Sequence, residues 1–282
     1  MSHQGVILAL TSDLFIVPRL QDIGRQAGFE VLIADSPQTL GAAGAPSQRS
    51  IPLTEPLEGP DAAFLRKVVD LRPALLLVDT DSRLIPWERW IQTLKTSAAT
   101  RRIPILAFGP HVEERQLAAA RDAGADQALP RGQLLASLGS LIREWAKVVD
   151  EEGLHSACQG ELSRLGQEGI ALLNSGEYFE AHEALEHAWM EAAELEGYLY
   201  RALLQVSVAY LHVERGNYRG ALKMLLRLKQ WLEPLPDACR GVDLALLKAQ
   251  VQEFWQALEA AGPQGLPSLD RALLKPIPLL SS

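Results

Sequence analysis

The chain has 282 residues and a formal net charge of −8 at neutral pH, with 48% hydrophobic and 22% charged residues. This length suits two domains of ordinary size, and the composition is that of folded globular chains. The acidic balance disfavours a nucleic-acid partner, which would need clustered Lys and Arg, and it disfavours docking on an anionic membrane. No apolar run is long enough to cross a bilayer and no basic start leads into one, so we expect a cytoplasmic protein.

The two cysteines, Cys158 and Cys239, lie far apart along the chain and form no C-x-x-C pair. Disulfides are rare in cytoplasmic proteins, and metal sites usually draw on closely spaced cysteines. The sequence therefore favours two reduced thiols over a disulfide or a metal role.

Short apolar runs rich in β-branched residues alternate with stretches of helical spacing through the first half of the chain. We expect strands at 6–10, 30–34, 74–79, 103–108 and 127–129, and helices at 14–27, 61–71, 87–97, 113–123 and 132–148. Alternation of strand and helix predicts a parallel sheet that is covered on both faces. Right-handed crossovers then give a flavodoxin-like, doubly wound α/β domain with five strands.

Residues 36–60 interrupt this alternation with five prolines and three glycines. Compact α/β domains usually connect a strand to the next helix with only a few residues. We therefore expect a mobile surface loop over this segment.

The runs RPALLLVD, IPILAFG and AGADQALPR are similar to response-regulator receiver domains, and the resemblance covers about residues 5–146. It implies an acidic pair after the first strand for Mg²⁺, an aspartate ending the third strand, a Ser or Thr after the fourth, and a Lys after the fifth. Phosphoryl transfer requires these groups because it needs a carboxylate nucleophile, a hard cation held by oxygens, and a cation that pairs with the new charge.

In this chain Asp79 stands at the phosphoacceptor position, but most of the other positions depart from the receiver pattern. The departures are Thr11 and Ser12 in place of the acidic pair, with Asp13 following them, Gly109 in place of Ser or Thr, and Arg131 in place of Lys. Neutral hydroxyls do not offset the dehydration of Mg²⁺, and a guanidinium lacks the compact geometry of an ammonium. We expect a pseudo-receiver in which Asp79 is buried and paired with Arg131. A receiver that is still phosphorylated is the alternative.

The second half of the chain has no strand alternation. We expect an α/β domain over 1–149, a charged linker over 150–160, a helical domain over 161–262, and a tail rich in Pro and Leu over 263–282. Helical spacing covers 161–174, 178–195, 198–214, 218–231 and 242–261. Short connections make successive helices antiparallel neighbours, so a helical bundle is predicted. The tail is expected to pack as an extended segment, with a partner-docking peptide as the alternative.

A short internal repeat in the helical half draws attention to two polar residues. Segment 176–185 recurs at 216–225 with Gly, Tyr and Ala at matching positions, but His182 and Glu186 stand where the second copy has leucines. Polar groups at core-type positions cost stability unless they are partnered. The next helix carries Arg201, Gln205 and His212 on one stripe, and antiparallel pairing about a turn near residue 197 brings that stripe toward them.

We therefore predict a polar cluster that spans two neighbouring helices. Its members are His182, Glu183, Glu186, Trp189, Arg201, Gln205 and His212. One interpretation is a hydrogen-bond network that fixes the register of the helices. The other is a site for a small ligand or for Zn²⁺ or Fe²⁺, with His182, Glu186 and His212 as the candidate metal ligands. The sequence does not identify a cofactor.

The run from Gly176 to Trp189, with Leu203-Leu-Gln205 and residues 216–221, resembles the family called domain of unknown function 309. The resemblance covers about residues 160–260. It implies a small helical domain that self-associates, and it implies no particular reaction.

These observations favour a non-catalytic signalling or scaffolding protein that binds a protein partner or a second copy of itself. The receiver-like domain would supply a docking surface, and the helical domain would bind a partner or a small ligand. The alternatives are a metal-dependent hydrolase centred on His182, Glu186 and His212, or a response regulator that is still phosphorylated at Asp79.

Overall fold

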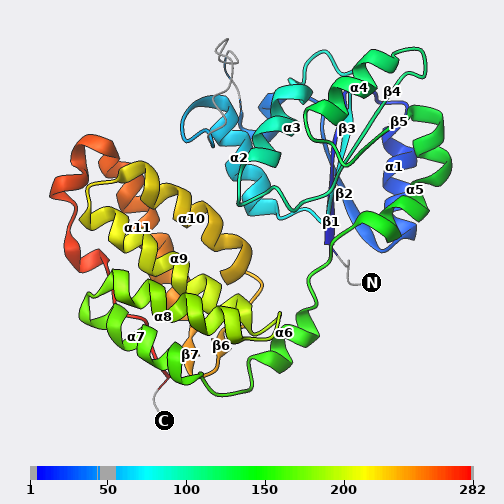
Figure 1. The fold of residues 1–282 in the computed structure, drawn as a ribbon. Coiled ribbons are helices and arrows are strands. Elements are labelled where there is room, and N and C mark those ends of the chain that lie inside the picture. The colour runs from blue at the N-terminus through cyan, green and yellow to red at the C-terminus, as the bar shows by residue number, and fades with distance from the viewer. Residues whose placement is uncertain (1–4, 43, 45–54, 281–282) are drawn as a thin grey trace. The chain divides into compact units, whose positions relative to one another are not determined.

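The chain folds into two compact units, Met1–Val148 and Val149–Ser282, which are called here the α/β unit and the helical unit. The computed structural model describes residues 5–42, 44 and 55–280 (Figure 1). Among these residues, no helix combines the length and the apolar composition that a membrane crossing requires.

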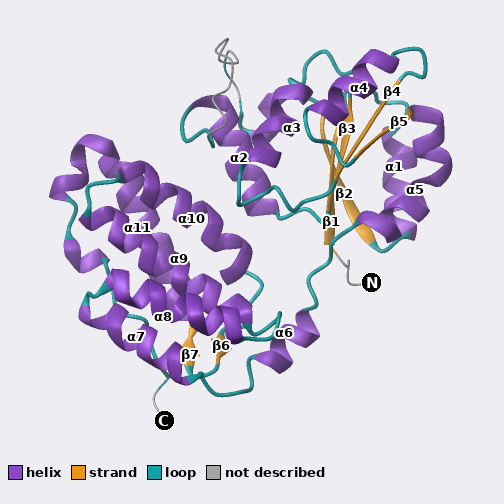
Figure 2. Ribbon diagram, viewed as in Figure 1, coloured by secondary structure: helices purple, strands orange, loops and turns teal. Residues whose placement is uncertain are grey.

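The α/β unit is built on a five-stranded parallel sheet with the order β2-β1-β3-β4-β5 (Figure 2). The strands are β1 (Gly5–Leu10), β2 (Phe29–Ala34), β3 (Leu75–Asp79), β4 (Ile105–Gly109) and β5 (Gln127–Pro130). Every residue of β3 and β4 is buried, as expected for strands that are covered on both faces. This strand order is the flavodoxin-like order, so the predicted fold of the first half is confirmed.

Helices cover both faces of this sheet. They are α1 (Val17–Gln26), α2 (Gly59–Leu71), α3 (Trp87–Thr96), α4 (Glu114–Asp122) and α5 (Arg131–Trp145). Helices α1 and α5 pack together on one face, where Leu20, Leu134 and Leu138 meet the apolar side chains of the strands. On the other face α2 packs on α3, and the rings of Phe64 and Trp90 stack with their centroids 3.9 Å apart.

Two segments of the α/β unit, the start of α1 and the segment 36–60, differ from what the sequence predicts. Helix α1 begins at Val17 rather than Leu14, because the Asp13 carboxylate accepts a hydrogen bond from the Phe15 amide and Pro18 opens the helix. Of the predicted mobile loop over 36–60, residues 43 and 45–54 lie outside the described residues. Its described part contains the short helix η1 (Pro37–Leu40) and a buried Glu55, which accepts hydrogen bonds from the Ser97 hydroxyl and the Ala98 amide.

The helical unit is an antiparallel bundle, as predicted. Its helices are α6 (Glu151–Ala157), α7 (Arg164–Ser175), α8 (Tyr178–Glu191), α9 (Gly197–Glu214), α10 (Tyr218–Leu232) and α11 (Leu244–Gly265). Helix α9 is central and packs against both α8 and α10. The short repeat seen in the sequence corresponds to two equivalent turns. Gly176 follows α7 and Gly216 follows the end of α9, with φ of 88° and 67°.

Elements that the sequence did not predict lie at the edges of the helical unit. The expected linker contains α6, and a short hairpin of β6 (Ala238–Cys239) and β7 (Val242–Asp243) precedes α11. After α11 the chain forms η2 (Leu266–Ser268) and η3 (Arg271–Leu273), and Leu279 then pairs with Val242 of the hairpin. Hydrogen bonds thus hold the tail against the bundle.

The prediction of two reduced thiols is wrong, because a disulfide joins Cys158 and Cys239. Helix α6 places Cys158 beside the hairpin, although 81 residues separate the two cysteines along the chain. Both side chains are buried. Sequence spacing could not reveal this proximity, since it depends on the fold of the whole helical unit.

Candidate functional site

The predicted receiver-like residues lie together at the carboxyl edge of the parallel sheet. Asp79 ends β3, Gly109 ends β4, and Arg131 opens α5 directly after β5. Asp13 follows β1 in the loop that leads to α1. Because parallel strands present their carboxyl ends at one edge, these four residues share one site, which is called the receiver-like pocket.

The Arg131 guanidinium lies between the acidic side chains of this pocket. Its Nη1 donates to Asp13 Oδ2 at 2.9 Å, and its Nη2 lies 3.2 and 3.3 Å from the two carboxylate oxygens of Asp79. The same Nη2 is 3.7 Å from Asp81 Oδ2. One fixed cation from the chain itself therefore pairs with three carboxylates.

Asp79 is the most buried of these acids, with only 1% of its surface exposed. Its carboxylate accepts hydrogen bonds from the Thr11 hydroxyl at 2.8 Å and from the Asp81 amide at 3.1 Å. Burial raises the pKa of Asp79 above its ordinary value, while the Thr11 and Asp81 hydrogen bonds and the Arg131 charge act to lower the pKa. These polar partners favour the ionised form against the cost of burial.

Gly109 stands where a receiver carries a Ser or Thr, and the neighbouring strand fills its side-chain space. A Cβ atom added to Gly109 would come within 2.2 Å of Thr80 Oγ1. The Thr80 hydroxyl is buried and donates to the Phe108 carbonyl at 3.3 Å. The sequence did not single out Thr80, although its place directly after Asp79 at the end of β3 is a signal that could have done so.

The ion pairs of Arg131 bear on whether the pocket could hold a divalent cation. A hard divalent cation needs several oxygen ligands that are free to replace its water shell. Here the guanidinium already pairs with the carboxylates of Asp13 and Asp79, and a guanidinium is more weakly hydrated than an ammonium. Both carboxylates are therefore already ion-paired from within the chain, although one positive charge does not cancel them all.

The predicted stripe on α9 faces away from the core of the helical unit. Arg201, Gln205 and His212 are half-buried, whereas residues on the other side of the helix, such as Leu203 and Tyr210, are buried. The Arg201 guanidinium lies between two indole rings, 4.6 Å from the centroid of Trp189 on α8 and 4.4 Å from that of Trp231 on α10. Cation–π contacts thus join three helices at this face.

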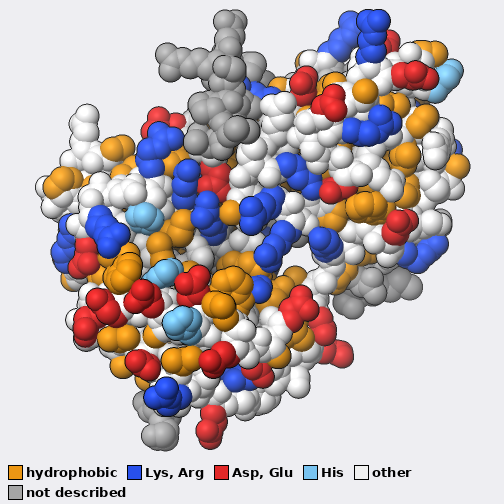
Figure 3. Space-filling model, in the orientation of Figure 1, with side chains coloured by type: hydrophobic (Ala, Val, Ile, Leu, Met, Phe, Trp, Pro, Cys, Tyr) orange, Lys and Arg blue, Asp and Glu red, His pale blue; other side chains and the backbone are white. Residues whose placement is uncertain are grey.

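The other members of the predicted cluster are more dispersed. His212 Nδ1 lies 3.1 Å from Asn217 Nδ2, and the His182 ring is 6.4 Å from the ring of Phe179. Glu186 is half-buried and Glu183 is exposed. Histidines lie among acidic and basic side chains on the face shown in Figure 3.

The electrostatic surroundings of His212 disfavour its charged form. Burial lowers the pKa of His212, and the positive charges of Arg215 and Arg227 lower it further. Within the described part of the chain, no group of three or more His, Cys, Asp or Glu side chains is arranged so that it could hold a metal ion.

Trp231 belongs to this face but was missed in the sequence. A turn centred on Gly216 joins α9 to α10, and Arg201 and Trp231 are equally far from it along the chain. Antiparallel helices joined by a short turn bring such positions opposite each other. The reasoning that placed Arg201 near Trp189 would therefore also have found Trp231.

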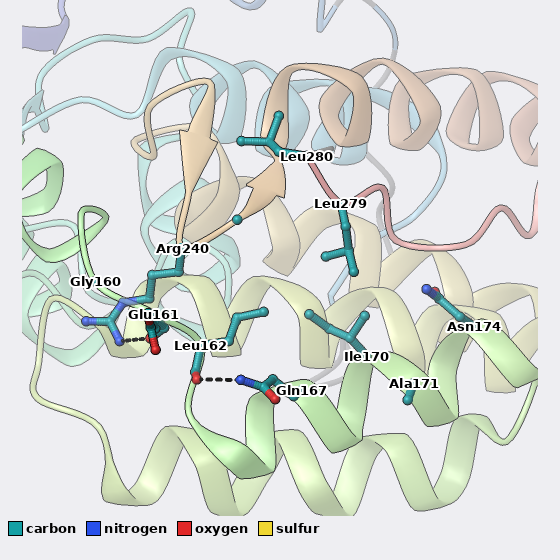
Figure 4. Close-up of a pocket in the computed structure, with 11 residues that line it drawn as sticks. Gly160, Glu161, Leu162, Gln167, Ile170, Ala171, Asn174, Arg240, Leu279 and Leu280 are labelled. Atoms are coloured by element: carbon teal, nitrogen blue, oxygen red, sulfur yellow. Dashed lines mark hydrogen bonds between the residues drawn. The ribbon is translucent and has the colours of Figure 1, made fainter. Parts of the chain in front are cut away.

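A cavity of about 700 Å³ lies between α7, the hairpin and the tail (Figure 4). Its wall is largely apolar, and the polar side chains in it already hold backbone groups. Arg240 donates to the Glu161 carbonyl at 2.8 Å, and Gln167 donates to the Leu162 carbonyl at 3.1 Å. Asn174 accepts from the Ile277 amide at 2.7 Å. These bonds fix the hairpin and the tail, so the wall offers few uncommitted polar groups.

Comparison with known proteins places one family segment in the helical unit. Residues 167–224 match the family described as Domain of unknown function (DUF309). This segment runs from α7 into α10 and contains the whole predicted polar cluster. An uncharacterized protein of Aquifex aeolicus (strain VF5) is 26% identical over 95 residues, which are 33% of this chain and 28% of that protein. The chain thus spans less than a third of the length of that relative.

Solved structures similar to the chain include receiver domains. The receiver domain of the sensor histidine kinase PA1611 from Pseudomonas aeruginosa PAO1 is 14% identical, with a TM-score of 0.38, over 50% of this chain and 96% of that one. A putative response regulator from Chloroflexus aurantiacus is 19% identical, with a TM-score of 0.37, over 49% of this chain and 96% of that one. At such scores these likenesses carry no functional argument. The fold assignment follows from the strand order.

Proposed function

We propose that the chain is a non-catalytic signalling or scaffolding protein whose receiver-like unit is not phosphorylated. The observation that supports this most is the position of Arg131, which pairs with Asp13 and Asp79 at 2.9 and 3.2 Å. Phosphoryl transfer to Asp79 would require a divalent cation beside this carboxylate and an accessible oxygen. The guanidinium competes for both.

We further propose that the helical unit binds a protein partner, a second copy of the chain, or a small ligand through the face formed by α8, α9 and α10. The stack of Trp189, Arg201 and Trp231 supports this proposal, because Trp and Arg are enriched among residues that dominate binding interfaces. The metal-dependent hydrolase gains no supporting observation, because the described residues hold no cluster of metal-ligating side chains.

The cytoplasm remains the proposed location, with neither nucleic acid nor membrane as a partner. The net charge of −8 supports this, because an acidic chain is repelled by nucleic acid and by an anionic membrane surface. The disulfide is unusual for that compartment. Burial of both cysteine side chains limits attack by thiolates, so the cross-link is compatible with this proposal.

Incubation with acetyl phosphate and Mg²⁺ tests the absence of phosphorylation. We expect the intact mass of the full chain to stay unchanged, because the Asp79 carboxylate is already paired with Arg131. Asp79→Asn identifies the modified residue should a mass gain occur. Asp81→Asn is the matched control, since Asp81 lies beside the same guanidinium but is half-exposed. A gain of one phosphoryl group that only Asp79→Asn abolishes would contradict the proposal.

A further inference from the structure

Four large apolar side chains of the α/β unit are exposed around the receiver-like pocket. Leu14 and Phe15 are 74% and 96% exposed, Leu84 is 63% exposed, and Val112 is 71% exposed. These four side chains are called the apolar rim. Single exposed apolar residues are ordinary on protein surfaces, but a group of them at one place marks an interaction site.

The topology of the sheet brings the apolar rim together. Leu14 and Phe15 follow β1, Leu84 follows β3, and Val112 follows β4. These strands are direct neighbours in the sheet and run parallel, so the three loops leave the same edge side by side. The rim therefore borders the pocket that Asp79 and Arg131 occupy.

The segments that leave this edge are acidic. Between the carboxyl end of each strand and the next helix, at 11–16, 35–36, 79–86, 110–113 and 130–131, there are five acidic and two basic residues. Arg131 pairs with Asp13, Asp79 and Asp81, and its single positive charge offsets only one of these three negative charges. Asp35 and Glu113 add two more negative charges, against Arg83 alone. The surface thus combines apolar side chains with a negative charge that the internal cation does not cancel.

We propose that the apolar rim docks a segment of another protein that carries apolar side chains together with Lys or Arg. The apolar side chains would cover Phe15 and its neighbours, and the basic ones would face Asp81 and Glu113. This inference rests on the proposed signalling or scaffolding role of the chain and names a surface of the α/β unit that would serve it. A second copy of the chain fits less well, because an isologous contact would set the same acidic loops against each other.

The exposure of the apolar rim is consistent with an exchangeable partner. Fully burying a Leu or Phe side chain contributes about 1.5 to 3 kcal/mol, so part of this gain remains available in the free chain. Complementary charge mainly directs association and selects the partner. The apolar rim would therefore supply most of the affinity, and Asp81 and Glu113 would supply the selectivity.

Labelled synthetic peptides and the full chain test this proposal by fluorescence anisotropy. The probe is an amphipathic helical peptide with a leucine face and lysines opposite. One control peptide replaces its lysines with glutamates, and a second replaces its leucines with serines. We expect each control to bind at least about tenfold more weakly than the probe, which corresponds to about 1.4 kcal/mol. Equal binding of any control would overturn the proposal.

Variants of the chain then locate the binding surface. Phe15→Ser and Leu84→Ser should each weaken binding of the probe about tenfold, a loss in the range expected for one buried apolar side chain. Leu246→Ser is the matched control, because Leu246 is 47% exposed but lies on α11 of the helical unit. Asp81→Asn combined with Glu113→Gln should narrow the difference in affinity between the lysine and glutamate peptides. An equal loss of affinity in Leu246→Ser, or none in Phe15→Ser, would refute the assigned surface.

Sedimentation equilibrium tests whether a second copy of the chain, rather than another protein, covers the apolar rim. If the chain self-associates and Phe15→Ser abolishes that association, the apolar rim binds a second copy and the proposed partner is wrong. The phosphodonor experiment reports separately on Asp79. A chain that gains a phosphoryl group but still binds the probe through Phe15 would refute only the absence of phosphorylation.

Discussion

Replacing both cysteines, as Cys158→Ala with Cys239→Ala, should lower the free energy of unfolding of the helical unit by about 4.5 kcal/mol, given the 81-residue separation of the pair. In the chain-entropy view, the cross-link excludes many extended conformations of the unfolded chain, and the excluded number grows with loop length.

The structure around the disulfide bears on how the helical unit would respond. Arg240 follows Cys239 and binds the same segment, since its side chain donates to the Ala157 carbonyl at 2.9 Å and its amide donates to the Cys158 carbonyl at 2.9 Å. These hydrogen bonds remain after reduction. We therefore expect the native fold to persist at reduced stability rather than to be lost.

Urea denaturation of the full chain, followed by circular dichroism, measures this effect. The transition of the helical unit should move to lower urea, while that of the α/β unit serves as an internal control and should stay in place. Wild-type protein in excess dithiol should behave like the double variant. Unchanged stability in the variant would contradict the predicted contribution, and two reactive thiols in the unfolded, unreduced protein would show that the cross-link is absent.

Replacing Arg131 by Met should destabilise the α/β unit by about 3 kcal/mol at neutral pH, since removing one partner of a buried ion pair leaves an uncompensated charge. Asp79 would be left buried with only its hydrogen bonds from Thr11 and the Asp81 amide. Asp13 would also lose its ion pair. Methionine keeps much of the length and apolar stem of arginine, so the change mainly removes charge and hydrogen bonds.

The effect of Arg131→Met should depend on pH in a defined direction. The native pKa of Asp79 is raised above 3.8, so this group contributes stability below that pH and loses the contribution as pH rises through the native pKa. The Arg131 charge lowers this pKa, so its removal raises the native pKa further. The penalty of the substitution should therefore be largest at neutral pH and should shrink as Asp79 takes up a proton.

A double-mutant cycle with Asp79→Asn isolates the pair. The double variant, Asp79→Asn with Arg131→Met, should lose less stability than the sum of the two single losses. Each single change leaves the partner's charge unpaired, whereas the double change removes both charges of the pair. Carbon NMR of the Asp79 carboxyl group should show the higher pKa in Arg131→Met directly. A penalty that is equal at pH 4 and pH 7 would indicate that Arg131 contributes through packing rather than charge.

The fold of the α/β unit was accessible from the sequence because its strands are short and largely apolar, and its central strands β3 and β4 are fully buried. β3 and β4 read as continuous apolar runs for that reason, and alternation with helices fixed the parallel arrangement. The hairpin was not accessible, because a two-residue strand leaves no periodic pattern. The sequence predicts a linker where α6 lies, because seven residues with two acids and a glycine resemble a solvated connection.

The receiver-like pocket was partly accessible, since carboxyl ends of parallel strands meet at one edge and Asp79 and Arg131 stand at two of them. That rule predicts which residues lie at the same edge, but it does not predict the contacts between their side chains. It could not show that the guanidinium reaches Asp13 and Asp79 together, or that Thr80 fills the space beside Gly109. The disulfide depends on contacts across 81 residues, which no local pattern records.

Calorimetric titration of the full chain with MgCl₂ tests the central claim most directly, namely that Arg131 takes the place of an exchangeable cation beside Asp79. We predict no saturable binding beyond that of Asp79→Asn, because the carboxylates of Asp13 and Asp79 are already paired with the guanidinium. Stoichiometric binding of Mg²⁺ that is lost in both Asp79→Asn and Asp13→Asn would contradict it.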